Sequence, residues 1–205
     1  MIEPAYWNQA KKYLSKKDKK LNEIINSFDG HLKSKKNPFY SLCKSIIGQQ
    51  ISVQSAESVW KRLSKKSKRI TPININNLKK DEIRSCGVTR QKTEYLKLLS
   101  QNFLNKNFSP SKLKALNDEE AILYLCENKG IGKWTAEMYL IFNQNRQNIF
   151  PIQDIGLLKA ISKNYNTDYP PDSQSLERCK ARWSPYCTVA TWYMWRSVDP
   201  VPVEY

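Results

Sequence analysis

The sequence predicts an all-α protein, and three observations lead to that expectation. Apolar residues recur at the three- and four-residue spacing of amphipathic helices, whereas the alternation typical of strands is nearly absent outside residues 69–75. Capping residues and glycines stand where such helices would begin and end. A 205-residue chain with 40% hydrophobic and 11% aromatic residues can also bury a core without disulfides.

The elements follow from this pattern in chain order. Residues 13–28 indicate one helix that Asp29 and Gly30 would end, and Pro38 is expected to begin a second helix that ends at Gly48. Ser52 is a plausible N-cap for a third helix, which continues into the basic segment KRLSKKSKR at 61–69. That segment could be a solvated helix end, a DNA contact or a nuclear-import signal.

Further short helices are expected around residues 86–88, and the pair Asn117 and Glu120 predicts a capping box at the start of another. A Gly-x-Gly turn separates that helix from one that begins about at Lys133. Ser184 and Pro185 would open a last helix, so rich in tyrosine and tryptophan that we expect it to be enclosed.

The charge balance predicts polyanionic partners. Thirty-four Lys and Arg against 19 Asp and Glu give a net charge of +15, which attracts phosphate backbones. No apolar stretch approaches the ~18 residues of a membrane span, and the first residues lack a signal-peptide pattern, so neither a membrane nor secretion is expected. A cytosolic chain is the default expectation.

The cysteines do not predict a metal or disulfide framework. They are odd in number and scattered, there is no CxxC pair, and His31 is the one histidine. Reduced, buried thiols are therefore favoured for Cys43, Cys86, Cys126, Cys179 and Cys187. No cofactor is expected.

The turn Gly130, Ile131, Gly132 could hold a phosphate. Glycines allow close approach of the backbone, the N–H groups at the start of the following helix favour an anion, and Lys133 adds a cation. Contacts of this kind hold a duplex without reading its sequence. An ordinary helical hairpin that needs tight packing would explain the two glycines equally well.

Twenty residues after Trp134 comes the carboxylate of Asp154, in FPIQDIGLLKAI. With this addition the chain resembles the helix-hairpin-helix superfamily of DNA glycosylases, closest to its AlkA-like 3-methyladenine branch. The matching segments are FYSLCKSIIGQQISVQSA, KGIGKWTAEMYLIF, FPIQDIGLLKAI and, more weakly, RWSPYCTVATWYMWRS. The resemblance covers roughly residues 5–198 in the family's order, without the β-rich N-terminal domain of some relatives.

The resemblance implies two helical lobes with an active cleft between them. One lobe would comprise about residues 1–44 and 146–205, and the other about 45–145 with the helix-hairpin-helix at about 118–143. It also implies a monomer that acts on double-stranded DNA containing damaged bases, in the nucleoid or the nucleus according to the organism.

Asp154 matches the family's catalytic aspartate. Breaking a base-to-sugar bond leaves positive charge on the sugar, which a nearby ionised carboxylate can stabilise while it orients water. The alternative is a purely structural N-cap for a helix beginning at Ile155. One side chain could fill both roles.

Trp134 and Trp195 match pocket tryptophans of the same branch. Indole faces favour the cationic ring of an alkylated purine such as 3-methyladenine or 7-methylguanine, which leaves without a strong general acid. Either residue could instead be plain core, Trp195 especially. Relatives that also cut the strand have a lysine where this chain has Trp134, and Lys133 is one residue off, so the resemblance implies a monofunctional enzyme.

Gln49 and Gln50 fall where the family inserts a wedge into the gap left by a flipped base, with Gln50 at the wedge position. The alternative is a solvated loop. The resemblance also allows a monovalent cation on the main-chain carbonyls of Cys126, Asn128 and Ile131.

The sequence therefore predicts a monofunctional, metal-independent DNA glycosylase of base excision repair that hydrolyses the N-glycosidic bond of alkylated purines. Two alternatives stay open. One is a glycosylase with lyase activity or one for other damaged bases, and the other is a non-catalytic helix-hairpin-helix DNA-binding protein.

Overall fold

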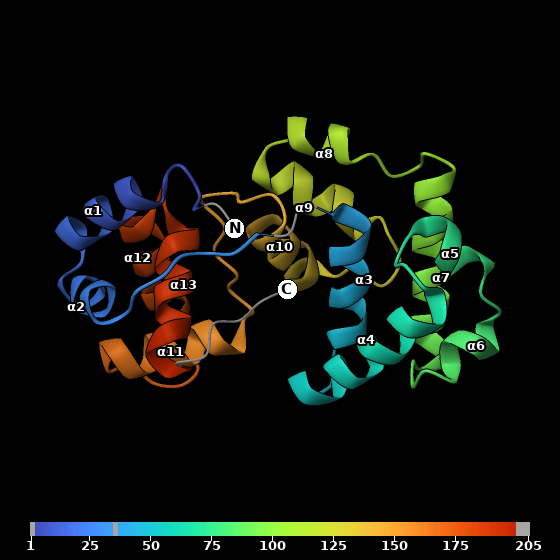
Figure 1. Ribbon diagram of the computed structural model, residues 1–205. Coiled ribbons are helices and arrows are strands. Elements are labelled where there is room, and N and C mark those ends of the chain that lie inside the picture. Colours follow the sequence, from blue (N-terminus) through green and yellow to red (C-terminus); the bar gives the residue numbers. More distant parts are fainter. Residues whose placement is uncertain (1–2, 35–36, 200–205) are drawn as a thin grey trace. The chain divides into compact units, whose positions relative to one another are not determined.

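The computed structural model describes residues 3–34 and 37–199, and the regular elements of these residues are all helices (Figure 1). The all-α prediction is confirmed. The described chain divides into two compact units, residues 3–34 with 140–199 and residues 37–139. We call them the terminal unit and the middle unit. Among the described residues, no helix has the length and apolar character needed to cross a membrane.

The terminal unit joins distant parts of the chain around helix α13 (Cys187–Val198). Its other complete helices are α1 (Trp7–Lys17), α2 (Lys19–Ser27), α11 (Ile155–Tyr165) and α12 (Ser173–Trp183). All four pack on α13, and in Figure 1 the blue α1 and α2 lie beside the red α13. Every residue from Cys187 to Trp195 is buried, and Trp7 packs edge-on against Trp192 at 5.4 Å. The aromatic helix is therefore the core of this unit, as its composition predicts.

The middle unit is organised around α7 (Arg90–Leu104), which packs on α3, α5 and α6. Its helices are α3 (Pro38–Gly48), α4 (Val53–Ser67), α5 (Pro72–Asn77), α6 (Lys80–Arg84), α7, α8 (Pro110–Ala115), α9 (Asp118–Cys126) and most of α10 (Lys133–Phe142). Leu42 and Ile46 of α3 and Leu96 and Leu99 of α7 are buried. This apolar packing makes α7 a rigid base for the loops described below.

The unit boundaries differ from the expected ones near 44 and 145. Helix α3 is uninterrupted and packs on α4 and α7, so residues 38–44 go with the middle unit. The second boundary lies inside α10, after Tyr139. Phe142 at the end of α10 stacks on Trp195 of α13, with ring centroids 5.8 Å apart, which explains why this turn belongs to the terminal unit.

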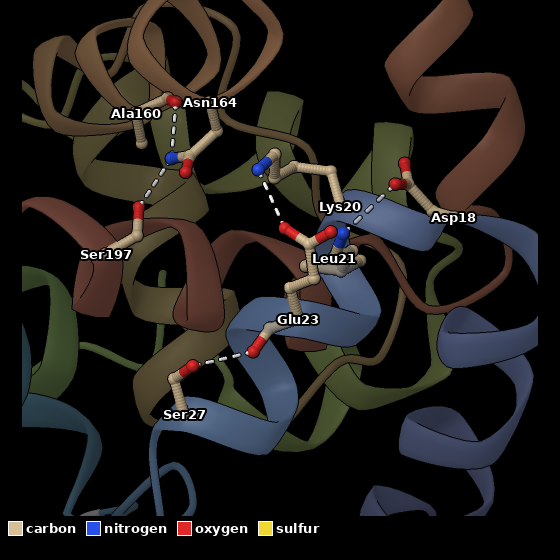
Figure 2. A network of polar contacts seen from close by, with 8 residues as sticks. All are labelled: Asp18, Lys20, Leu21, Glu23, Ser27, Ala160, Asn164 and Ser197. Carbon is tan, nitrogen blue, oxygen red and sulfur yellow. Dashed lines mark hydrogen bonds and ion pairs between the residues drawn. The ribbon is translucent and has the colours of Figure 1, made fainter.

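The single helix expected near the N-terminus is two helices, because Asp18 interrupts it. Its backbone is extended, and its Oδ1 caps α2 by accepting a hydrogen bond from the Leu21 amide at 3.0 Å (Figure 2). Its Oδ2 accepts hydrogen bonds from Tyr165, Arg182 and Trp183 at 2.7 to 3.2 Å. Burial opposes the charge, but the hydrogen bonds outweigh it and lower the pKa of Asp18. The carboxylate thus ties α2 to α11 and α12.

One further expectation is wrong. Ser184 does not open the last helix but ends α12, its amide donating to Lys180, and α13 begins only at Cys187. The alternating residues 69–75 follow the all-α prediction instead: Thr71 caps α5 through the Asn74 amide, and proline stands at the first position of that helix.

Other helix starts agree with the sequence. Ser52 caps α4 by accepting a hydrogen bond from the Ser55 amide at 3.2 Å. Asn117 and Glu120 form the reciprocal capping box at the start of α9, with bonds of 2.9 and 3.0 Å. The caps confirm that local side-chain chemistry sets these boundaries.

Candidate active site

Asp154 is the N-cap of α11, as one of the two interpretations of this residue predicts. Its Oδ1 accepts a hydrogen bond from the Leu157 amide at 2.7 Å, and its own amide donates to Pro151 at 2.9 Å. The residue is only 8% exposed. A carboxylate at the start of a helix is favoured by the helix dipole. The cap therefore fixes a negative group in a nearly enclosed place.

Trp195 holds the same oxygen. Its indole Nε1 donates to Asp154 Oδ1 at 2.7 Å, so Oδ1 receives one main-chain and one side-chain hydrogen bond. The indole ring is 9% exposed and lies parallel to Phe142, at an angle of 8°. The orientation of the Trp195 indole beside the carboxylate is thus set by both stacking and hydrogen bonding.

Gly156 makes room for this arrangement. A Cβ at this position would lie 3.1 Å from Asp154 Oδ1 and 3.2 Å from Trp195 Cδ1. Such contacts are tighter than ordinary van der Waals packing. Glycine in the first turn of a helix is unfavourable for helix formation. That conflict with helix propensity is the signal in the sequence that could have marked Gly156.

The hairpin turn between α9 and α10 is built on Gly130. Its φ of +94° is a conformation that glycine adopts freely, and a Cβ there would lie 2.3 Å from the Tyr95 ring. Ile131 is buried and its amide donates to Asn128 at 2.9 Å. Gly132 is exposed, with open space where a Cβ would be.

Lys133 and Trp134 begin α10. The lysine side chain is exposed, whereas the tryptophan is half-buried. Both belong to the middle unit, whereas Asp154 and Trp195 belong to the terminal unit. The next residue, Thr135, is buried and takes part in the contact described next.

The turn after α3 presents Gln50 and anchors Gln49. Gln50 is exposed and has a φ of +57°, which is uncommon for a residue other than glycine. The side-chain Nε2 of Gln49 donates to the Gly130 carbonyl at 2.9 Å and to Thr135 Oγ1 at 3.1 Å. Gln49 therefore joins this turn to the hairpin, and Gln50 is the one whose side chain is presented to solvent.

Lys92 contacts the turn after α3, which the sequence did not indicate. Its Nζ donates to the carbonyls of Ile47 and Gln49, at 2.8 and 2.5 Å. Partial burial lowers the pKa of this ammonium group. In the sequence, Lys92 is one of several lysines on a helix and has no local pattern that sets it apart.

The possible cation site on the carbonyls of Cys126, Asn128 and Ile131 stays a prediction. The Asn128 carbonyl accepts one hydrogen bond, from Ile131, and a carbonyl oxygen has a second lone pair for a ligand. The Asn128 side chain is satisfied by Asn102 and Leu125. Among the described residues, no three His, Cys, Asp or Glu side chains gather as a metal site would require.

Comparisons with known proteins place the chain among DNA repair glycosylases. Among curated proteins, a DNA-3-methyladenine glycosylase of Saccharomyces cerevisiae is 31% identical over 93% of this chain and 79% of its own length. DNA-3-methyladenine glycosylase 1 of Schizosaccharomyces pombe is 27% identical over 87% of this chain and 81% of its own length.

Solved structures share the fold over nearly the whole chain. The crystal structure of a DNA-3-methyladenine glycosidase from Bacillus halodurans aligns with a TM-score of 0.84 and 27% identity, covering 97% of this chain and 93% of that one. The fission yeast 3-methyladenine DNA glycosylase, in complex with abasic DNA, aligns with a TM-score of 0.82 and 25% identity, covering 96% and 100%. The family model described as HhH-GPD superfamily base excision DNA repair protein matches residues 43–185, and the chain belongs to this superfamily.

Proposed function

We propose that this protein is a monofunctional DNA glycosylase of base excision repair that releases alkylated purines of the 3-methyladenine and 7-methylguanine type from duplex DNA. The observation that carries the proposal is the Asp154 carboxylate, fixed at the start of α11 by Leu157 and Trp195 in a chain of this superfamily. The relatives named for 3-methyladenine support the choice of substrate.

Asp154 would act on the sugar. As the glycosidic bond breaks, positive charge develops on the deoxyribose, and a fixed carboxylate stabilises that charge without having to reorganise. The same group can orient a water molecule and accept its proton as it attacks C1′. The two N–H donors at Oδ1 keep the carboxylate in one orientation during this step.

The leaving base needs little catalytic assistance from the protein. An alkylated purine carries positive charge before the bond breaks, so it departs without a strong general acid. An indole face attracts such a cationic ring, and we assign this role to Trp134, which is half-buried near the start of α10. Trp195 would line the pocket and would also hold the carboxylate, because it donates to Asp154 and stacks on Phe142.

DNA contact would come from the exposed groups of the middle unit. Gly132 and Lys133 are exposed at the start of α10, where the helix dipole and the lysine favour a phosphate. Gln50 would fill the gap that the flipped base leaves. We further propose that the protein acts as a monomer on DNA that contains damaged bases.

The test is an excision assay on a duplex with a single 7-methylguanine. We expect free base and an intact strand with an abasic site, and no enzyme–DNA adduct after borohydride treatment, because the indole of Trp134 is not a nucleophilic amine. Matched duplexes with 8-oxoguanine or uracil should react far more slowly. Asp154→Asn is the control that should bind but not release base.

Each alternative has its own result. A DNA-binding protein without activity would bind the methylated duplex and release no base. A lyase would give strand cleavage and a trapped adduct, and loss of that adduct in Lys133→Ala would identify Lys133 as the amine.

A further inference from the structure

One face of α7 contacts both loops to which the proposed function assigns DNA contact. Lys92 binds carbonyls of the turn after α3, and Tyr95 packs against Gly130 of the hairpin. Asn102 donates to Oδ1 of Asn128, which lies in the hairpin turn, at 2.9 Å. Residues three, seven and ten positions apart lie near one face of a helix, so a single rigid helix supports both loops.

Lys92 supports the turn through main-chain groups. The last carbonyls of a helix have no partner within that helix, and a cation near the C-terminus of α3 also complements the helix dipole. Two of the three N–H donors of Lys92 serve Ile47 and Gln49. The next residue, Gln50, has the left-handed backbone that a glutamine rarely adopts, so this conformation needs support from its surroundings.

Gln49 extends that support to the hairpin. Its main-chain carbonyl accepts from Lys92, while its side-chain amide donates to the Gly130 carbonyl and to Thr135 Oγ1. The turn and the hairpin are therefore joined to each other as well as to α7. Movement of Lys92 would be passed on to both loops.

We infer that Lys92 is a positioning residue for DNA interrogation: it fixes the turn at residues 48–50 against the hairpin, so that Gln50 enters the duplex while the hairpin holds the backbone. This inference rests on the proposed function and adds to it a residue that touches neither the base nor the sugar. Lys92 acts through Gln49 and Gln50.

The chain offers a matched control on the same helix. Lys97 is also partly buried on α7, and its Nζ donates to the carbonyls of Ile75, Asn76 and Leu78 at the end of α5. Desolvation lowers the pKa of both lysines. Lys97 makes the same kind of contact with a helix end that has no part in the proposed DNA surface.

The experiment compares Lys92→Met with Lys97→Met. Both changes keep an unbranched side chain of similar length and remove the ammonium N–H donors. Both should therefore lower the thermal midpoint of unfolding by similar amounts. In single-turnover excision of 7-methylguanine at saturating enzyme, we expect Lys92→Met to be slower than wild type by about tenfold to a hundredfold. Small misplacements of groups that position the substrate reduce rates to this extent. Lys97→Met should stay within about twofold of wild type, and Lys92→Arg should recover most of the rate.

A binding measurement separates this inference from the proposed function. A duplex with an abasic-site analogue and 2-aminopurine opposite it reports unstacking by fluorescence even if no base is ever released. Wild type and Lys97→Met should give the same signal, whereas Lys92→Met and Gln50→Ala should both lose it. Because Lys92 acts through Gln50, the double variant should lose little more than either single variant.

Equal excision rates and equal fluorescence in Lys92→Met and Lys97→Met would overturn the inference and leave the proposed function intact. Absence of excision by the wild type, with the fluorescence difference retained, would overturn the proposed function and leave the positioning role of Lys92 intact.

Discussion

The Asp154 site differs from the junction where Gln49 joins the turn at residues 48–50 to the hairpin, because the two hold different kinds of group in place. At Asp154 a side chain is the proposed working group, and a main-chain amide and an indole hold it in a nearly enclosed place. In the middle unit, main-chain groups and an exposed glutamine are the proposed working parts, and the half-buried side chains of Lys92 and Gln49 hold them. Chemistry on the sugar needs one fixed charge, whereas gripping a duplex needs a fixed backbone.

This difference leads to different sensitivities. A site built on one charge should fail when that charge is removed, even if the shape is kept. A site built on backbone should tolerate changes of side chain at its surface but fail when the backbone is displaced. Four substitutions test this contrast.

Asp154→Asn should have the largest effect on activity. Asparagine can still cap α11, so the thermal midpoint should change little, but the charge that stabilises the sugar is gone and excision should fall by about a thousandfold. The measurement pairs single-turnover excision with thermal unfolding. Activity retained with lowered stability would show that capping is the only role of Asp154.

Gly130→Ala should disrupt the junction by destabilising the folded hairpin turn. The new Cβ meets the Tyr95 ring at 2.3 Å in a left-handed backbone, so we expect a loss of about 3 kcal/mol in the free energy of unfolding. Gly132→Ala is the control, because its Cβ enters open space and should leave urea denaturation unchanged. Equal stability of the two variants would break the contrast between holding and contacting positions.

Trp195→Phe sharpens the assignment at the carboxylate. Phenylalanine keeps a ring against Phe142 but removes the N–H donor to Asp154, and losing a hydrogen bond to a charged group should slow excision by about tenfold. If Trp195 positions Asp154, the slowing should be similar for every lesion and appear in kcat. Unequal slowing among lesions, appearing in KM, would instead indicate contact with the base.

Lys133→Ala should have the smallest effect. One lost phosphate contact weakens binding to all duplexes alike and makes the log–log salt dependence of binding shallower by about 0.9. Excision at saturating enzyme should be unchanged. A salt slope identical to that of wild type would mean that Lys133 does not contact a phosphate.

The sequence predicts the parts of this protein that depend on neighbouring residues. Ser52, Asn117 and Asp154 cap helices as expected, because an N-cap bonds an amide only a few residues away. The same local reasoning failed at Ser184, whose proline pattern fits a helix start but which ends α12. Helices α5, α8 and α12 were not expected at all.

Contacts between distant segments could not be read from the sequence. Asp18 looks like one charge in a lysine-rich helix, and nothing near it shows that partners 147 to 165 residues away require a break there. Likewise, the pairing of Trp195 with Asp154 spans 41 residues, and that of Lys92 with Gln49 spans 43. The resemblance to known glycosylases identified candidate residues, but the contacts that hold them come from the structure.

The composition of the terminal unit has a consequence for how the chain is made. Residues 3–34 leave the ribosome before the middle unit, but their packing partners in α13 are synthesised after it. The middle unit is continuous in sequence and can fold during synthesis, since domains fold as units while the chain emerges. Until residues 155–198 are translated, the apolar faces of α1 and α2 have no core to join. We therefore expect a nascent chain whose first 145 residues have left the ribosome to contain a protease-resistant middle unit and an N-terminal segment that chaperones bind.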